Sequence, residues 1–247
     1  MLIEEAAYGN RWRRVSPAAK GVFALTGLIA AFAAPTPPAA LAVAALLAAT
    51  ASLGAGVAAG LYLRVAAPAA GFLALSALTL LVSVDTDFSW CWAPEAWPRV
   101  AELAARSLAA LCALLGLVLT TPLPDLLGLL RRLRCPDVLL DLMVLCYRML
   151  FVFSAALHDT VTAQRARLGY ASTRLTRRSL GLLAANLTVQ VWQRAHGLHL
   201  AAQARNGDGP LRFLSPVFAH ARRDTVLAAL AGGLLIAAAR LSAGLGA

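Results

Sequence analysis

The sequence predicts an all-α, polytopic membrane protein with about five membrane-spanning helices and two further long helices in the cytoplasm. Of its 247 residues, 60% are hydrophobic and only 14% are charged, whereas an ordinary soluble domain carries about 25% charged residues. Apolar runs of near-spanning length recur along the chain, as the thickness of a bilayer requires of transmembrane helices. These runs lack the alternation of apolar and polar residues that marks the strands of a membrane barrel, so the spans are expected to be helices.

Spans are expected at about residues 21–34, 39–53, 65–84, 100–121 and 225–241. The first is expected to stay in place as a span and not to be removed as a secretion signal, because Glu4 and Glu5 precede it and a second span follows at once. Prolines at 35–38 separate the first two spans, and the Gly- and Ala-rich stretch 54–64 is expected to be a loop. In the fourth span, Glu102 and Arg106 are four residues apart and are expected to form an ion pair.

The distribution of charge predicts the orientation in the membrane. Basic residues lie at positions 11, 13, 14 and 20, before the first span, and at 131, 132 and 134, after the fourth. The loop 85–98 carries Asp85, Asp87, Glu95 and three Trp residues but no basic residue. Because cytoplasmic loops are enriched in Lys and Arg, we expect a protein of the bacterial inner membrane whose N-terminus is cytoplasmic. Membrane lipid is then expected to surround the spans.

The chain is expected to divide into an N-terminal membrane domain (1–121), a cytoplasmic or interfacial region (122–223) and a C-terminal span (224–247). Residues 131 to 223 contain 14 Arg and 4 Asp, a balance equal to the net charge of the whole chain, +10. Nucleic acid is not an expected partner, because spans flank this basic segment and it carries no binding motif. Anionic lipid or an acidic protein partner fits it better.

Two long helices are expected within this basic region. The stretch 138–157 is apolar enough to cross the membrane but contains Asp141 and Arg148. A crossing would put the basic cluster 165–178 outside, so we expect the stretch to lie along or just inside the membrane and to continue as a helix to Arg167. The second helix is expected at about 179–205, roughly 40 Å long. Its apolar stripe at helical spacing comprises Leu180, Leu183, Ala184, Leu187, Val191, Ala195, Leu198 and Ala202.

A seven-residue pattern, A-x-x-A-R-x-G, ends both of these helices. It occurs at 163–169 and again at 201–207. Each Gly is a helix stop signal, and each Arg would stand in the last turn, at the negative end of the helix dipole. The duplication in the most basic part of the chain indicates two docking tips. The candidate site residues are Ala166, Arg167, Leu168, Ala204, Arg205 and Asn206.

The sequence contains no recognisable catalytic motif. It lacks GxxxxGK[ST], GxSxG and HExxH. His196 and His199 are three residues apart, but no carboxylate or Cys stands at ligand spacing, so we expect neither a metal site nor a cofactor. A membrane enzyme that binds lipid or polyprenyl phosphate through the arginines stays open as an alternative, as does a stand-alone secondary transporter. The phosphatidyltransferase motif does not fit, because it needs Asp-Gly before Ala-Arg and here Asp208-Gly209 follows it.

At these residues the chain resembles the transmembrane T component of energy-coupling factor (ECF) transporters, with CbiQ, the cobalt-type family, as the nearest likeness. Besides the two Ala-Arg tips, the resemblance rests on the run 121–126, the stretch 133–137 and Tyr147-Arg148. In both copies the third motif position departs from the more usual Gly or Ser, since Leu168 and Asn206 stand there.

The resemblance implies a non-catalytic subunit whose two long helices are coupling helices. Each Arg tip would enter a groove on one subunit of a CbiO-like ATPase dimer. A CbiM-like membrane subunit would bind the substrate, and a small CbiN-like subunit would accompany it. The transported ion would be cobalt, with a nickel or vitamin transporter as the alternative.

Overall fold

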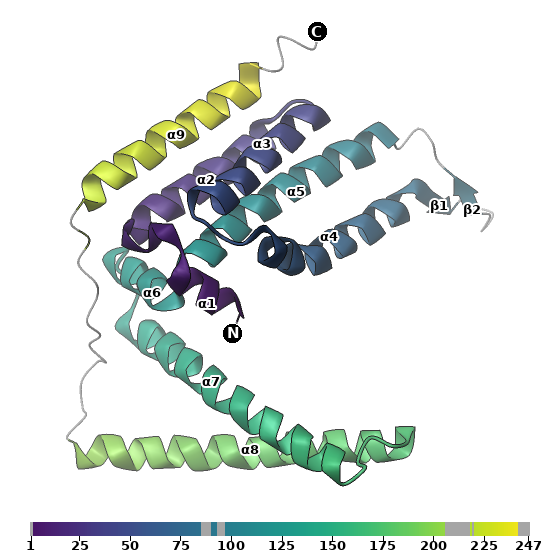
Figure 1. Ribbon diagram of the computed structural model, residues 1–247, viewed down its shortest axis with the longest axis vertical. Helices are drawn as coiled ribbons and strands as arrows, with labels where there is room; N and C mark the ends of the chain where they lie inside the picture. Colours follow the sequence, from purple (N-terminus) through teal and green to yellow (C-terminus); the bar gives the residue numbers. More distant parts are fainter. Residues whose placement is uncertain (1, 85–89, 93–96, 206–217, 219, 242–247) are drawn as a thin grey trace. The chain divides into compact units, whose positions relative to one another are not determined.

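The computed structural model describes residues 2–84, 90–92, 97–205, 218 and 220–241 (Figure 1). In this part the chain is helical except for two short paired strands, so the all-α prediction is confirmed. Two compact units form, one from Met1–Leu129 with Ser215–Ala247 and the other from Leu130–Leu214.

The α-helices are α1 (Leu2–Gly9), α2 (Pro17–Ala33), α3 (Pro37–Ala49), α4 (Ala59–Leu81), α5 (Trp97–Thr120), α6 (Leu123–Arg132), α7 (Asp137–Ala166), α8 (Thr173–Ala204) and α9 (Ala221–Leu241). A 3-10 turn, η1 (Arg11–Arg14), follows α1, and a π-helical turn, η2 (Thr50–Gly54), extends α3. Strands β1 (Val82–Val84) and β2 (Trp90–Trp92) pair antiparallel, with Ser83 opposite Cys91. The acidic residues of the loop 85–98 lie outside the described residues.

Proline and hydroxyl residues set several of the helix starts. Ser16 caps α2 by accepting a hydrogen bond from the backbone N–H of Ala19, and Pro17 occupies the first turn. Pro37 likewise stands in the first turn of α3. Ser172 caps α8, accepting from the N–H of Leu175. Helix α8 therefore begins six residues before its predicted start at 179, because Ser172 and Thr173 act as the start signal.

Among the residues that the structure describes, five helical segments are long and apolar enough to cross a membrane. Four of them match expected spans: 37–54, 59–81, 97–120 and 221–241. The fifth is α7, which we had expected to lie along the membrane, while α2, an expected span, is a shorter apolar helix of 17 residues. The predicted loop 54–64 is largely helix, since only the residues between η2 and α4, with Gly56 at φ +76°, are non-helical.

The first unit is a bundle built on small side chains. Its main core joins α2, α3, α5 and α9, and most of its buried residues are alanines, such as Ala30, Ala40 and Ala109, each of which is fully buried. Small residues let helices approach closely inside a bilayer, where contact between well-packed backbones holds the bundle together. The expected Glu102–Arg106 pair is confirmed at 2.7 Å, and Arg106 also donates to the Ala34 carbonyl at the end of α2 (3.0 Å).

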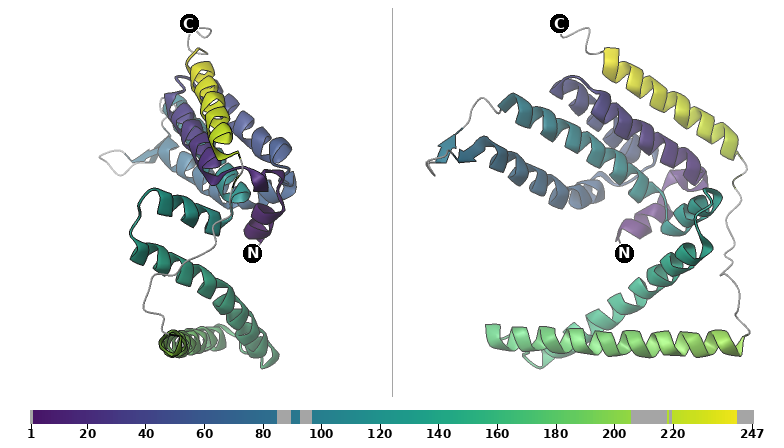
Figure 2. Two further views of the ribbon diagram at one scale, coloured as in Figure 1. Left: turned by 90° about the vertical axis from the view of Figure 1, so that its left-hand side faces the viewer. Right: turned by 180° about the vertical axis from the view of Figure 1, so that it is seen from behind.

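Among the described helices of this bundle, α2 and α9 make the most extensive contact, although they are about 200 positions apart in the sequence (Figure 2). At their crossing, a Cβ atom added to Gly232 would lie well inside van der Waals contact of the Thr26 side chain. The neighbouring Gly233 has open space at the same position. Gly232 therefore sets how closely the last helix approaches the first apolar helix.

The second unit contains α7 and α8, which are joined by a short turn (Figure 1). Leu140 is the buried residue on α7 and Ser179 the buried residue on α8. The apolar stripe expected on α8 faces no other part of the described chain along most of its length. Only Leu183 and Leu187 of that stripe are half-buried.

Replacing Gly232 by Ala should destabilise the bundle, whereas replacing Gly233 by Ala should not. Overpacking of this kind costs about 1–3 kcal/mol, while the same change at Gly233 adds a better helix former in open space. Thermal unfolding of the two variants in detergent, followed by tryptophan fluorescence, measures the difference. Equal melting temperatures for the two variants would show that α2 and α9 do not pack at Gly232.

Candidate functional site

The first predicted tip lies at the end of α7, where the backbone forms a Schellman motif. Arg167 is the C-cap residue, directly after Ala166. The N–H of Gly169 donates to the Gln164 carbonyl (2.8 Å), and the N–H of Leu168 donates to the Arg165 carbonyl (3.0 Å). These two hydrogen bonds satisfy carbonyls that the end of a helix leaves open. The arginine therefore stands on a closed helix end that is held by its own backbone.

Leu168, and not Gly169, adopts the left-handed conformation that this cap requires. Its φ is +56°, whereas Gly169 has a negative φ. We had assigned the stop signal to the glycine, so that assignment was wrong by one position. A left-handed backbone costs a residue with a Cβ about 1–2 kcal/mol. Leu168 is 71% exposed, so its side chain gains too little burial within the chain to offset this free-energy cost.

Gly169 is needed for a different reason, which is the close approach of α8. A Cβ atom at this position would lie 2.6 Å from Ser179 Oγ and 2.9 Å from the Gln164 carbonyl oxygen. Ser179 Oγ donates to the Gly169 carbonyl (2.9 Å) from the second turn of α8. The glycine thus allows the end of α7 to contact the start of α8.

Three further hydrogen bonds fix the turn between the two helices. Gln164 Nε2 donates to the Ser179 carbonyl (3.0 Å), and the Tyr170 hydroxyl donates to Gln164 Oε1 (2.7 Å). Ser172 closes the turn as the N-cap of α8. The roles of Gln164, Tyr170 and Ser179 are not predictable from the sequence, because their contacts depend on where α8 begins.

The second predicted tip lies at the end of α8. The helix ends at Ala204 with Arg205 as its C-cap, and the N–H of Arg205 donates to the Ala202 carbonyl (3.1 Å). Both helices therefore end at the alanine of the repeated pattern, one residue before the predicted ends at Arg167 and Arg205, and each arginine is the cap residue. Asn206 and Gly207 lie outside the described residues.

Both guanidinium groups are exposed and free to bind something outside the chain. Arg167 and Arg205 are exposed, as are Ala166 and Ala204 beside them. Neither arginine forms an ion pair with any residue in the described ranges. The first tip is the more basic, because Arg165, Arg174, Arg177 and Arg178 are also exposed in the same turn and the start of α8.

The structure does not bring the two tips together. Arg167 stands just before α8 and Arg205 just after it, so they lie at opposite ends of this helix (Figure 1). At 1.5 Å per residue the 32 residues of α8 span about 48 Å. Within the described part of the chain, no three His, Cys, Asp or Glu side chains gather as a metal site would need. The arrangement can therefore bind two separate acidic surfaces.

Replacing Leu168 by Gly should stabilise the first tip by about 1 kcal/mol, because glycine adopts the left-handed conformation without the Cβ penalty. The same change at Leu182, an exposed residue inside α8, should destabilise by about 1 kcal/mol. Hydrogen exchange of the Leu168 and Gly169 amides measures the first effect and that of the α8 amides the second. Faster exchange at the tip of the Leu168→Gly variant would contradict the strained cap.

Comparison with known proteins identifies the family. The sequence profile of the CbiQ family, described as cobalt transport protein, matches residues 9–214. The cobalt transport protein CbiQ of Rhodobacter capsulatus is 36% identical over 213 residues, covering 86% of this chain and 87% of that protein. The CbiQ protein of Salmonella typhimurium is 30% identical over 205 residues, covering 78% and 90%.

A putative fused cobalt transport protein, CbiMQ, of Methanocorpusculum labreanum is 36% identical over 115 residues, covering 44% of this chain and 19% of that protein. The match of the profile spans both described units and includes both arginine tips. The chain is therefore a multi-pass membrane protein that belongs to the CbiQ family of cobalt transport proteins.

Proposed function

We propose that this chain is the transmembrane coupling subunit of an ECF-type importer for cobalt. In this role it hydrolyses no ATP and holds no ion of its own. It passes the movement of an ATPase dimer to a membrane subunit that binds the ion. The observation that carries the proposal is the pair of exposed arginines at opposite ends of α8, neither of which forms an ion pair with a described residue.

The spacing of the tips fits a dimeric partner. Two sites separated by most of the length of α8, which is about 48 Å, are too distant for one small groove, but each can enter a groove of its own on one of two ATPase subunits. Arginine suits this contact because its planar fork makes two charge-assisted hydrogen bonds with one carboxylate. Ala166 and Ala204 are small, so each helix end can sit deep in such a groove.

The helices are suited to transmit displacement. ATP-driven closure of the dimer would move the two grooves and the arginines bound in them. The turn between α7 and α8 is fixed by the hydrogen bonds of Gln164, Tyr170 and Ser179, so a push at Arg167 moves both helices together. Packed helices shift as rigid elements between discrete arrangements.

The exposed apolar surface of α8 and one relative support further membrane subunits as partners. The apolar stripe of α8 is available to a neighbouring subunit, since most of it is exposed in the chain by itself. The fused CbiMQ relative joins a CbiM part and a CbiQ part in one protein, which supports a CbiM-like substrate-binding subunit as a partner. A small CbiN-like subunit would complete the complex. The N-terminus and both tips would face the cytoplasm, where the ATPase is.

Replacing either Arg167 or Arg205 by Ala should weaken association with the ATPase and reduce cobalt uptake at least tenfold. Loss of one charge pair buried in an interface costs about 2–5 kcal/mol. Lysine at the same positions should restore little, because it cannot form the two-pronged contact. Co-purification of the ATPase with the tagged chain, and uptake of cobalt by cells, measure the two effects.

Arg194→Ala is the matched control, because Arg194 is exposed in the middle of α8, away from both tips. It should leave association and uptake unchanged. Full complex yield and full uptake with both Arg167 and Arg205 replaced would refute the proposal. Uptake of nickel in preference to cobalt by the same cells would refute the choice of ion alone.

A further inference from the structure

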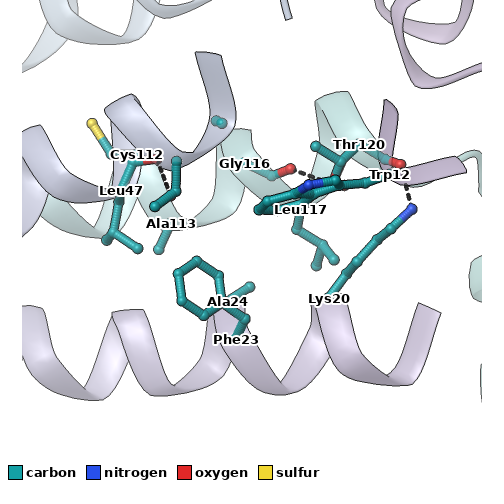
Figure 3. A pocket seen from close by; sticks show the side chains of 12 residues that line it. Trp12, Lys20, Phe23, Ala24, Leu47, Cys112, Ala113, Gly116, Leu117 and Thr120 are labelled. Atoms are coloured by element: carbon teal, nitrogen blue, oxygen red, sulfur yellow. Dashed lines mark hydrogen bonds between the residues drawn. The ribbon is translucent and has the colours of Figure 1, made fainter. Parts of the chain in front are cut away.

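The turn between α5 and α6 contains a backbone carbonyl that its own helix leaves open. In an α-helix the Thr120 carbonyl would accept from the N–H of residue 124, but residue 124 is proline and has none. Thr120 is buried, so water is not at hand as a substitute. Lys20 Nζ donates to this oxygen (2.8 Å), and Asn10 Nδ2 donates to it as well (3.0 Å). Figure 3 shows Lys20 reaching the carbonyl beside Trp12 and Thr120.

A partly buried ion pair lies five residues further on, in the first turn of α6. The Asp125 side chain is only 4% exposed and pairs with the guanidinium of Arg13. Arg13 also stands over the ring of Tyr8, 5.1 Å from its centre. Asp125 has a second favourable contact, since a negative charge in the first turn faces the positive end of the helix dipole. We call Asn10, Arg13 and Lys20, with the Thr120 carbonyl and Asp125, the N-terminal clamp.

The N-terminal side of the clamp is itself held against the bundle. The N–H of Arg11 donates to the Ala55 carbonyl (2.9 Å), and Asn10 Nδ2 donates to the Ala7 carbonyl (2.7 Å). Trp12 packs on Gly54 so closely that a Cβ there would lie 2.8 Å from its ring. The clamp therefore joins the start of α6 to a part of the bundle that is fixed at several points.

The other end of α6 leads into α7. Helix α6 closes with the same cap geometry as the first tip: Arg134 has φ +62°, and the N–H of Cys135 donates to the Leu130 carbonyl (3.2 Å). Arg131 and Asp137 approach to 3.9 Å across this turn. Since α7 begins at Asp137 and ends at Ala166, directly before Arg167, the chain leads from the first tip to the membrane bundle along α7 and then α6.

From this arrangement we propose that Arg13 is a positioning residue for transport, because the N-terminal clamp is where movement of α7 enters the membrane bundle through α6. The inference rests on the proposed function. When the clamp holds α6 against the bundle, a displacement at Arg167 rotates the bundle. Without the clamp, α6 moves independently of the bundle, and ATP hydrolysis proceeds without transport. Burial of Lys20, Thr120 and Asp125 in a chain this apolar is costly unless the groups are paired, and here each has its partner.

The test is the amount of cobalt imported per ATP hydrolysed. It uses the complex purified through this chain and reconstituted in liposomes, with Co²⁺ as the transported ion. Arg13→Gln should lower this ratio at least fivefold while ATP hydrolysis and complex yield stay near normal. Arg13→Lys should restore most of it. Arg14→Gln is the matched control, since Arg14 is exposed and forms no ion pair with a described residue, and it should leave the ratio unchanged.

A second measurement covers the case in which the variant assembles poorly. Hydrogen exchange of the Arg13→Gln chain by itself should be faster in α6 and unchanged in α2 and α5. If ATP hydrolysis, cobalt uptake and complex yield fell in proportion, the positioning role of Arg13 would be refuted and its role would be structural. Unchanged hydrogen exchange in α6 would refute the positioning role as well. An unchanged cobalt-to-ATP ratio in the variant would do the same.

The failure of the clamp and that of the proposed function are separable. If the unmodified complex imports cobalt with ATP and loses this on replacement of Arg167 and Arg205, the coupling role stands whatever Arg13 does. If no ATPase binds the unmodified chain, the coupling role fails before the clamp is tested, and the exchange measurement on α6 still decides whether the clamp exists.

Discussion

The distance between the two arginine tips is fixed by a single uninterrupted helix, and the functional account depends on this constraint. Helix α8 has 32 residues without an internal proline, so its ends cannot approach each other unless the helix breaks. In the coupling role that we propose, Arg167 and Arg205 would therefore have to bind two separate surfaces at once. A partner with two equivalent grooves meets this demand, and a partner with one does not. Because α8 is a continuous helix, a displacement of one of its ends also displaces the other end.

The cap at the first tip gives a physical reason for the form of the repeated pattern. The alanine ends the helix, the arginine is the cap residue, and the next residue must adopt a left-handed backbone. Glycine or another residue that tolerates this conformation is therefore the natural choice for that third position. Leu168 occupies it here at an energetic cost, which the hydrogen bonds of Gln164, Tyr170 and Ser179 offset by closing the turn. The arginine keeps its place although the residue after it departs from the usual pattern.

Local signals in the sequence predicted much of the fold. Contacts between segments that are distant in the sequence could not be predicted from such signals. Proline positions and the Glu102–Arg106 spacing depend on neighbouring residues, and these predictions were confirmed. The ends of α7 and α8 were predicted to within one residue. The N-terminal clamp joins residues 100 or more positions apart, such as Arg13 and Asp125. The one readable hint was Pro124, which removes the donor for a carbonyl that then needs another partner. The role of Gly169 likewise depends on Ser179, ten residues later, and could not be read from the pattern alone.

Cross-linking from the two tips to the ATPase would show whether one chain binds two ATPase subunits. Photo-reactive residues would replace Leu168 and Gln203, which are exposed beside Arg167 and Arg205, in the complex purified through this chain. The account predicts that one doubly substituted chain becomes joined to two ATPase subunits at the same time, one from each end of α8. Attachment of both tips to a single subunit, or of neither tip to the ATPase, would contradict it.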